Sequence, residues 1–261
     1  MTVVLHELRR GKLAFCIWTG AISFMLLVTV ILYPEMKGEM EGLGDMFASM
    51  GSFTSAFGMD KLNFGTLIGY YAIECGNVLG LGGALFAALT AVRILSKEER
   101  DGTVDFLLTH PVSRARIITG KLVAVLLQII SLEIIVFALS LCSITAVGED
   151  IPWKAICLLH LSNSIMHIEI ACVCFGISAF MRRGSAGAGL GLAIMLYFLN
   201  ILANLSDKTD FLKYITPFGY CDGSDIVANR SLDGVMILIG AAFAALGVIL
   251  AYIRYCSKDV Q

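Results

Sequence analysis

The sequence predicts an all-α integral membrane protein with six transmembrane helices, and three observations lead to this fold class. Hydrophobic residues make up 57% of the 261 positions and charged residues 15%, with a mean hydropathy of +0.82. A soluble domain has about a quarter of its residues charged. Six apolar stretches approach the ~20 residues that cross a ~30 Å hydrocarbon core. Lysine and arginine collect on one side of these stretches, as membrane topology requires.

The first expected element is an interfacial helix over residues 1–12. Val4, Leu5 and Leu8 recur at helical spacing on one side, while His6, Glu7 and several basic residues occupy the rest. Such a pattern is typical of a helix that lies at the membrane surface. A frayed basic terminus is the alternative interpretation.

Six transmembrane helices are expected to follow. Their approximate ranges are 13–33, 66–95, 118–147, 155–181, 186–205 and 235–254. The second and third stretches are long enough to tilt or to project beyond the bilayer. Together with the interfacial helix they form a single transmembrane domain over residues 1–261.

Basic residues predict the orientation. If the N-terminus is cytoplasmic, thirteen of the 19 lysines and arginines fall on the cytoplasmic side and six fall on the outer side. Short loops rich in Lys and Arg stay in the cytoplasm. We therefore expect a multi-pass protein of the cell (cytoplasmic) membrane, with its N- and C-termini in the cytoplasm.

Two outer segments carry more apolar residues than a solvated loop needs. In residues 34–64 the apolar positions recur at three- or four-residue steps, namely Met36, Met40, Leu43, Phe47 and Met50. This spacing favours an amphipathic helix that packs on the bundle or the outer leaflet. Copper(I) binding by the thioethers is the alternative, although no histidine accompanies them. In residues 206–234, aromatic groups predict short helices that return towards the interface, divided at Pro217.

Polar side chains inside the transmembrane stretches are candidates for a substrate path or a subunit seam. A charge at bilayer depth costs about 3 kcal/mol on insertion scales, so each one needs a reason. The candidates are Glu74, Asn77, Glu133, His160, Asn163, His167, Glu169, Asn200 and Asn204. His160, Asn163 and His167 share one face of the fourth helix, and Glu169 projects from the other side. The alternative is that each makes an ordinary interhelical hydrogen bond.

Catalytic and cofactor motifs are absent from the sequence. It contains no phosphate-binding loop G-x-x-x-x-G-K-[ST], no dinucleotide fingerprint, no G-x-S-x-G and no H-E-x-x-H. We therefore expect no enzymatic activity and no cofactor or metal bound by this chain, and any energy must come from another polypeptide or an ion gradient. Most of the eight cysteines lie in apolar stretches, so a disulfide framework is not expected.

The longest polar interruption on the basic side of the chain, residues 96–121, separates the second and third transmembrane stretches. Apolar residues alternate there with acids and arginines, Pro111 disfavours helical geometry at His110, and Ser113 can cap the next helix. This pattern predicts a helix, a kink and a second helix, with exposed apolar groups rimmed by charge. Such a segment suits docking into a groove of a partner protein. A solvated charged loop would leave Phe106, Leu107 and Leu108 unexplained.

At this segment the chain resembles the ABC-2 family, the type-2 ABC exporter permeases. KEERDGTVDFLLTHPVSRARIITGK is similar to the family pattern E-E-x-x-G-T-x-[DE]-x-L-L-[ST]-x-P-[VI]-[ST]-R-x-x-[IL]-x-x-G-K. The matching positions are Glu98, Glu99, Gly102, Thr103, Asp105, Leu107, Leu108, Pro111, Ser113, Arg114, Gly120 and Lys121. His110 stands where a small or apolar residue is more usual.

The resemblance implies the type V exporter fold, with a cytoplasmic coupling helix between helices 2 and 3. It implies the permease subunit of an ATP-driven exporter, which pairs with a second copy or a sister permease and binds two cytoplasmic ABC ATPase subunits. ATP and Mg²⁺ would be bound by those ATPase subunits, and no nucleic-acid partner is expected. Within the coupling segment, residues 96–116, the expected docking residues are Glu98, Glu99, Gly102, Thr103, Val104, Asp105, Phe106, Leu107, Leu108, Pro111 and Arg114.

Two functions of other classes remain as alternatives. One is a membrane-embedded metal handler that uses His160, His167 and the cysteines. The other is a peptide-sensing or immunity subunit that binds an external peptide through its outer loops. The residues do not indicate which substrate is moved, and they leave a homodimer and a heterodimer equally open.

Overall fold

The computed structural model describes residues 2–49, 51, 54, 56, 62–97, 113–181 and 185–257. Within these ranges every regular element is helical, and six helices are long and apolar enough to cross a membrane. The prediction of an all-α membrane protein with six transmembrane helices is therefore confirmed.

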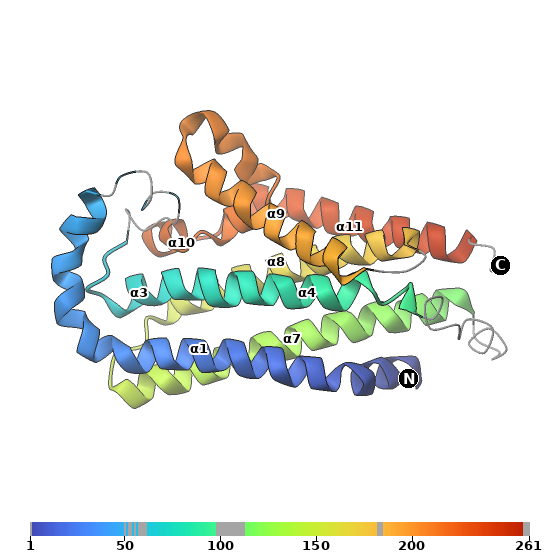
Figure 1. The fold of residues 1–261 in the computed structure, drawn as a ribbon, viewed down its shortest axis with the longest axis horizontal. Coiled ribbons are helices and arrows are strands. Elements are labelled where there is room, and N and C mark those ends of the chain that lie inside the picture. The colour runs from blue at the N-terminus through green and yellow to red at the C-terminus, as the bar shows by residue number, and fades with distance from the viewer. Residues whose placement is uncertain are drawn as a thin grey trace.

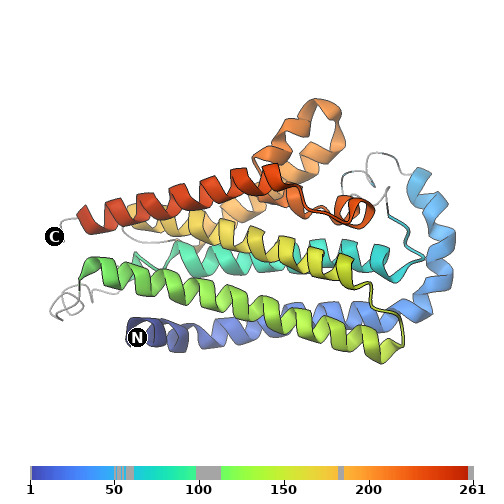
Figure 2. The ribbon, with the colours of Figure 1, turned by 180° about the vertical axis from the view of Figure 1, so that it is seen from behind.

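The long helices form an elongated bundle. Figure 1 shows α1 (Thr2–Ser49), α4 (Gly82–Val92), α7 (Arg114–Val147), α8 (Trp153–Phe180) and α11 (Gly234–Ser257) along its long axis. Helix α7 packs against α1 and α8, and α8 also packs against α4 and α11. The first helix begins and the last helix ends at the same end of the bundle, which Figure 2 shows from behind. A chain with an even number of transmembrane helices has its two ends on the same side of the bundle, as here.

Helix α1 differs from the expected interfacial helix followed by a separate span. It is one continuous helix of 48 residues that contains Pro34. Proline removes a backbone hydrogen bond and kinks a helix, and Figure 1 shows the last part of α1 turning away from the bundle axis. This part is the helix predicted from the methionine spacing. Met36 packs on the core and lies 3.9 Å from the Tyr70 hydroxyl, whereas the side chains of Met40, Leu43, Phe47 and Met50 fall outside the described residues.

The second transmembrane stretch, expected as one helix over 66–95, has three parts. Helix α3 (Leu67–Glu74) begins at Thr66, whose hydroxyl accepts a hydrogen bond from the Gly69 amide at 3.3 Å. It continues as a π-helical segment, η2 (Cys75–Leu81), and then as α4. A π-helical turn widens the backbone and is often found at functional sites. Side-chain periodicity alone did not reveal this change.

The next helices lie close to their expected ranges. Helix α7 begins after Ser113, whose hydroxyl accepts from the Arg116 amide at 3.3 Å, as the capping prediction required. It ends at Gly148, which has a left-handed φ of 80°. The fifth helix, α9, runs over Ala186–Leu205, the range expected from the sequence.

Three short helices fill the segment between α9 and α11. They are η3 (Asp207–Tyr214), η4 (Pro217–Cys221) and α10 (Gly223–Asn229), and the chain divides at Pro217 as predicted. Helix α10 packs on α3, and η4 packs on α8. Cys221, the last residue of η4, is buried there, and all eight cysteines are free thiols.

Helix α8 is the central helix of the bundle. In its most apolar stretch 61% of the residues are buried, compared with 17% in α9 and in α11. Helices α8 and α11 approach closely, since a Cβ atom on Gly176 would lie 2.7 Å from the Gly247 carbonyl oxygen. The centre of the protein is thus α8, and any polar residue on it must be matched by its neighbours.

Candidate functional site

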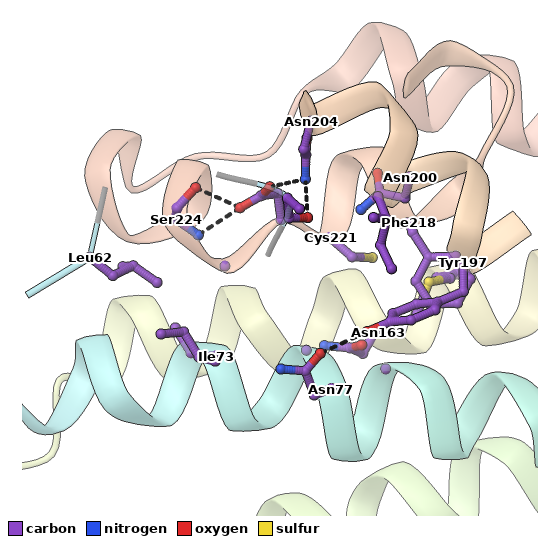
Figure 3. A pocket seen from close by; sticks show the side chains of 18 residues that line it. Leu62, Ile73, Asn77, Asn163, Tyr197, Asn200, Asn204, Phe218, Cys221 and Ser224 are labelled. Carbon is purple, nitrogen blue, oxygen red and sulfur yellow. Dashed lines mark hydrogen bonds between the residues drawn. The ribbon is translucent and has the colours of Figure 1, made fainter. Parts of the chain in front are cut away.

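The polar residues predicted for a path or seam separate into two groups. Four asparagines, Asn77, Asn163, Asn200 and Asn204, line one cavity (Figure 3). Glu133, His160 and His167 meet in a buried network between α7 and α8. Glu74 is half-buried on α3 and Glu169 faces η4, so these two belong to neither group.

The asparagine cavity lies between η2, α8, α9 and the short helices η4 and α10. Figure 3 shows Asn77 on η2, Asn163 on α8, and Tyr197, Asn200 and Asn204 on α9 directed towards it. Its volume is about 60 Å³. Drug-sized ligands occupy about 300–1,000 Å³, whereas one water needs about 10–15 Å³ of this kind of space. In this conformation the cavity therefore accommodates a few water molecules and no larger substrate.

Hydrogen bonds join the walls of this cavity. The Tyr197 hydroxyl donates to Asn77 Oδ1 at 2.9 Å and so links α9 to η2. Asn204 Nδ2 donates to Asp222 Oδ2 at 3.3 Å, and the other oxygen of Asp222 accepts from the Ser224 amide and hydroxyl at 2.9 and 2.6 Å. These contacts hold α9 against the second transmembrane stretch and against the N-terminus of α10.

Two amide oxygens of the cavity have no partner among the described residues. They are Asn163 Oδ1 and Asn200 Oδ1, and both atoms are buried. The Asn163 Nδ2 group donates to the Leu159 carbonyl at 2.8 Å, which fixes the orientation of that amide. An unsatisfied buried acceptor costs about 1–3 kcal/mol. The cavity thus presents acceptors to a molecule that can donate hydrogen bonds.

Glu133 and His167 form the first half of the buried network. His167 Nδ1 contacts Glu133 Oε1, and Nε2 lies 3.1 Å from the Gly80 carbonyl oxygen. A carbonyl oxygen only accepts, so Nε2 must carry a hydrogen. The pair therefore shares one proton and has no net charge, whether as imidazolium and carboxylate or as imidazole and carboxylic acid. This neutrality explains how an acid is accommodated in the middle of α7.

His160 forms the second half. Its Nε2 lies 2.8 Å from the Tyr71 hydroxyl, which donates to Ser140 Oγ at 2.8 Å. The ring therefore donates from Nε2. Its Nδ1 then faces Glu133 Oε2 at 4.0 Å, and neither atom has a hydrogen-bond partner among the described residues. The network connects α3, η2, α7 and α8. One more proton, placed between His160 Nδ1 and Glu133 Oε2, would complete its hydrogen bonds.

Glycines in the second transmembrane stretch make room for these polar groups. A Cβ atom on Gly83 would lie 2.2 Å from the His167 ring, and one on Gly80 would lie 3.1 Å from Asn163 Oδ1. At Gly76 a Cβ would meet nothing within 4 Å. The sequence contains the glycines but does not show which of them face α8.

Glu169 is held by the short helix η4. The Tyr220 hydroxyl donates to Glu169 Oε2 at 2.8 Å. Burial raises the pKa of Tyr220 above its ordinary value, so the hydroxyl keeps the proton that it donates. Glu169 therefore ties the segment between α9 and α11 to the central helix and does not reach the asparagine cavity.

The central part of the coupling segment falls outside the described residues. This part contains Glu98, Glu99, Gly102, Thr103, Val104, Asp105, Phe106, Leu107, Leu108 and Pro111. Arg114, the last expected docking residue, is described, and its Nη1 donates to the Cys256 carbonyl of α11 at 3.4 Å. The two ends of the segment are thus known, and both are attached to the bundle.

An ion cluster at these ends was not predicted. Glu7 Oε2 lies 3.1 Å from Lys97 Nζ, and Glu7 Oε1 lies 3.5 Å from Lys121 Nζ. Lys121 also donates to the Ile94 carbonyl at 2.6 Å and is only 1% exposed. Glu7 is 5% exposed and faces the bundle, while Leu5 is 50% exposed on the outside of the protein, where lipid can cover it. The sequence signal for this cluster was Lys121, a charged residue in the first turns of the apolar helix α7.

The chain is similar to a known family and to a bacterial protein. The family of ABC-2 family transporter proteins matches residues 1–260 of this chain. The uncharacterized protein YhcI of Bacillus subtilis (strain 168) is 23% identical over 215 residues, which cover 73% of this chain and 68% of YhcI.

Proposed function

Because this chain belongs to the ABC-2 transporter family and is thus a membrane permease of an ABC transporter, we propose that it is an exporter subunit driven by separate cytoplasmic ATPase subunits. Two such ATPases bind ATP and Mg²⁺, and two permeases, identical or sister chains, form the path. The permease supplies the path and the coupling, and the ATPases supply the energy.

The observation that carries this proposal is the family pattern over residues 98–121, which follows the second transmembrane stretch and continues into the first turns of α7. Its described ends support a role in coupling. Lys97 and Lys121 both contact Glu7 on α1, and Arg114 contacts α11. A push on the segment between them therefore reaches α1, α7 and α11 together.

The asparagine cavity suits one section of a substrate path. Its four asparagines offer amide groups, two of them with unpaired acceptor oxygens. Helix α9 forms one wall, and 17% of the residues in its most apolar stretch are buried compared with 61% in α8, so moving α9 uncovers less packed surface than moving α8 would. Breaking the Tyr197–Asn77 hydrogen bond would separate α9 from η2 and enlarge the cavity.

The coupling role is tested by co-purification with the ATPase subunit. Leu107→Asp combined with Leu108→Asp places two charges in the apolar part of the docking helix, so the complex should be lost. Phe211→Asp is the matched control, since Phe211 is an apolar side chain, 61% exposed, on η3 of the outer segment. Undiminished complex formation and ATPase stimulation in the Leu107/Leu108 variant would refute the docking role.

The metal-handler alternative gains no support from the histidines. Both ring nitrogens of His167 already contact protein atoms, and Nε2 of His160 is engaged by Tyr71. Among the described residues, no group of three or more His, Cys, Asp or Glu side chains is arranged to hold a metal ion. No specific observation favours the peptide-sensing alternative.

A further inference from the structure

The asparagine cavity presents three oxygens that can still accept hydrogen bonds. Asn163 is 1% exposed, its Nδ2 group donates to the Leu159 carbonyl at 2.8 Å, and its Oδ1 atom has no partner among the described residues. Asn200 Oδ1 is likewise buried and has no partner there. The Tyr197 hydroxyl gives its only hydrogen to Asn77, so its oxygen still accepts. These acceptors come from α8 and α9 and line one cavity (Figure 3).

The lining of this cavity also favours a positive charge. Its described residues include one carboxylate, Asp222, and no lysine, arginine or histidine. Asp222 accepts hydrogen bonds from Asn204 and Ser224, which are neutral and leave its charge in place. The rings of Tyr197 and Phe218, 5.4 Å apart, belong to the same lining, and the face of an aromatic ring attracts a cation. A ligand with both N–H donors and a positive charge therefore matches this lining better than water does.

The size of the cavity limits the ligand to a small chemical group. One water needs about 15 Å³ of this kind of space, so a volume of about 60 Å³ holds about four groups of that size. This is enough for the polar end of a larger molecule and not for the molecule itself. The cavity as it stands therefore selects one end group, and the rest of a substrate enters only when α9 moves.

We propose that the asparagine cavity binds the primary ammonium group of the transported substrate, an inference that rests on the proposed transport function. A primary ammonium has three N–H donors, as many as the accepting oxygens of Asn163, Asn200 and Tyr197. Asp222 compensates its charge, which a buried cation requires. A quaternary ammonium or a metal ion has the charge but no donor, and an alcohol has a donor but no charge. The substrate class is therefore a molecule with a free primary amine.

Methylammonium is the probe for this group. The purified full-length permease, in detergent and without any ATPase, is titrated with methylammonium chloride in place of sodium chloride at constant ionic strength, and the thermal unfolding midpoint is measured. A ligand that binds only the folded protein raises this midpoint. We expect methylammonium to reach half of its effect at an about tenfold lower concentration than potassium, which donates no hydrogen bond to the amide oxygens. Equal responses to the two cations, or no response to either, would overturn the proposal.

Three variants assign the binding to the cavity. Asn163→Leu removes the acceptor with the fixed orientation and should abolish the preference for methylammonium. Because this variant also loses the hydrogen bond to Leu159, Asn200→Leu on the less buried helix α9 is the second test and should weaken methylammonium binding about tenfold. Asn229→Leu is the matched control, since Asn229 is exposed at the end of α10 and does not line the cavity. A preference that survives Asn200→Leu, or that Asn229→Leu removes as strongly, would refute binding at this site.

The same measurement distinguishes the site from the transport function. It uses the permease alone, so its failure would leave the co-purification test of the coupling segment unaffected, and a failure of co-purification would leave the binding result unaffected. Hexylammonium and N-acetyl-lysinamide then distinguish the source of the amine, because the first is amphiphilic and the second resembles a peptide side chain. The compound that acts at the lower concentration identifies the substrate as an amphiphile or a peptide.

Discussion

Glu133 is an acid in the middle of a transmembrane helix, and the residues around it explain its presence. Its contact with His167 makes a neutral pair, and the Gly80 carbonyl accepts the remaining N–H of the ring. The sequence identified Glu133 and both histidines as residues that need partners. It did not identify the pairing, because a helical face read from one sequence does not show which face of another helix it meets.

Removing one member of this pair should cost more than removing both. Glu133→Leu leaves His167 without its partner, and breaking a buried pair costs about 3–5 kcal/mol. The double variant Glu133→Leu, His167→Leu should recover a large part of that loss, since coupled residues are not additive. The measurement is the thermal unfolding midpoint in detergent. Additive effects of the two substitutions would show that the pair is not coupled.

Two glycines of the same stretch should respond differently to alanine. Gly83→Ala places a methyl group against the His167 ring, and overpacking of this kind costs about 1–3 kcal/mol. Gly76→Ala meets no atom within 4 Å and removes a flexible residue from a helix, so it should be neutral or slightly stabilising. The measurement that compares the stability of the two variants is the thermal unfolding midpoint in detergent. Equal destabilisation would mean that α4 does not approach α8 at Gly83.

At the scale of elements, the ion cluster connects three helical segments at the ends of the coupling segment. Glu7 belongs to α1, Lys97 follows α4, and Lys121 lies in the first turns of α7. The amphipathic pattern of residues 1–12 predicted a helix there, and the helix is present. The pattern did not reveal that the side towards the bundle carries Glu7, because it counts apolar side chains and cannot anticipate that a glutamate is buried against two lysines.

A matched pair of lysine substitutions measures this cluster. Lys121→Met removes one of the two lysines that contact Glu7 and should lower stability by about 1.5–3 kcal/mol, the usual contribution of a hydrogen bond to a charged group, because Lys97 still compensates the carboxylate. Lys37→Met removes a partner of Glu149 on the other side of the bundle, where the two side chains are 45% and 31% exposed. An exposed pair contributes at most about 1 kcal/mol, so this variant should be nearly neutral. Similar unfolding midpoints would exclude a structural role for the cluster.

At the scale of the whole molecule, the number and order of the transmembrane helices could be predicted from length and hydropathy alone. The range expected for the fifth helix is the range of α9, because Ser185 and Ser206 bound a stretch with no internal break. The π-helical η2 and the continuous α1 could not be predicted. The first has its Gly80 carbonyl beside His167 of α8, a contact between distant parts of the chain, and the second continues through Pro34, a residue that usually indicates a helix end. Likewise, the four asparagines were identified one by one, and only the packing of α9 gathers them.

The predicted orientation can be tested with thiol labelling in intact cells. In an otherwise cysteine-free chain, Cys256 near the end of α11 should react with a membrane-impermeant maleimide only after permeabilisation. Ser231→Cys in the same background should react without it, because Ser231 is exposed in the outer segment before α11. The excess of Lys and Arg at the Cys256 end is the physical reason. The opposite labelling pattern would invert the topology.

The uninterrupted course of α1 has a mechanical consequence. Its 48 residues correspond to a contour of ~72 Å, more than twice the ~30 Å hydrocarbon thickness. Near one end Glu7 is clamped to the two lysines, and beyond the bend at Pro34, Met36 presses on the core. A helix held at these two points connects the two ends of the bundle through its own backbone. We therefore expect a displacement at the Glu7 end to reach Met36 along α1, without any signal passing through the polar interior.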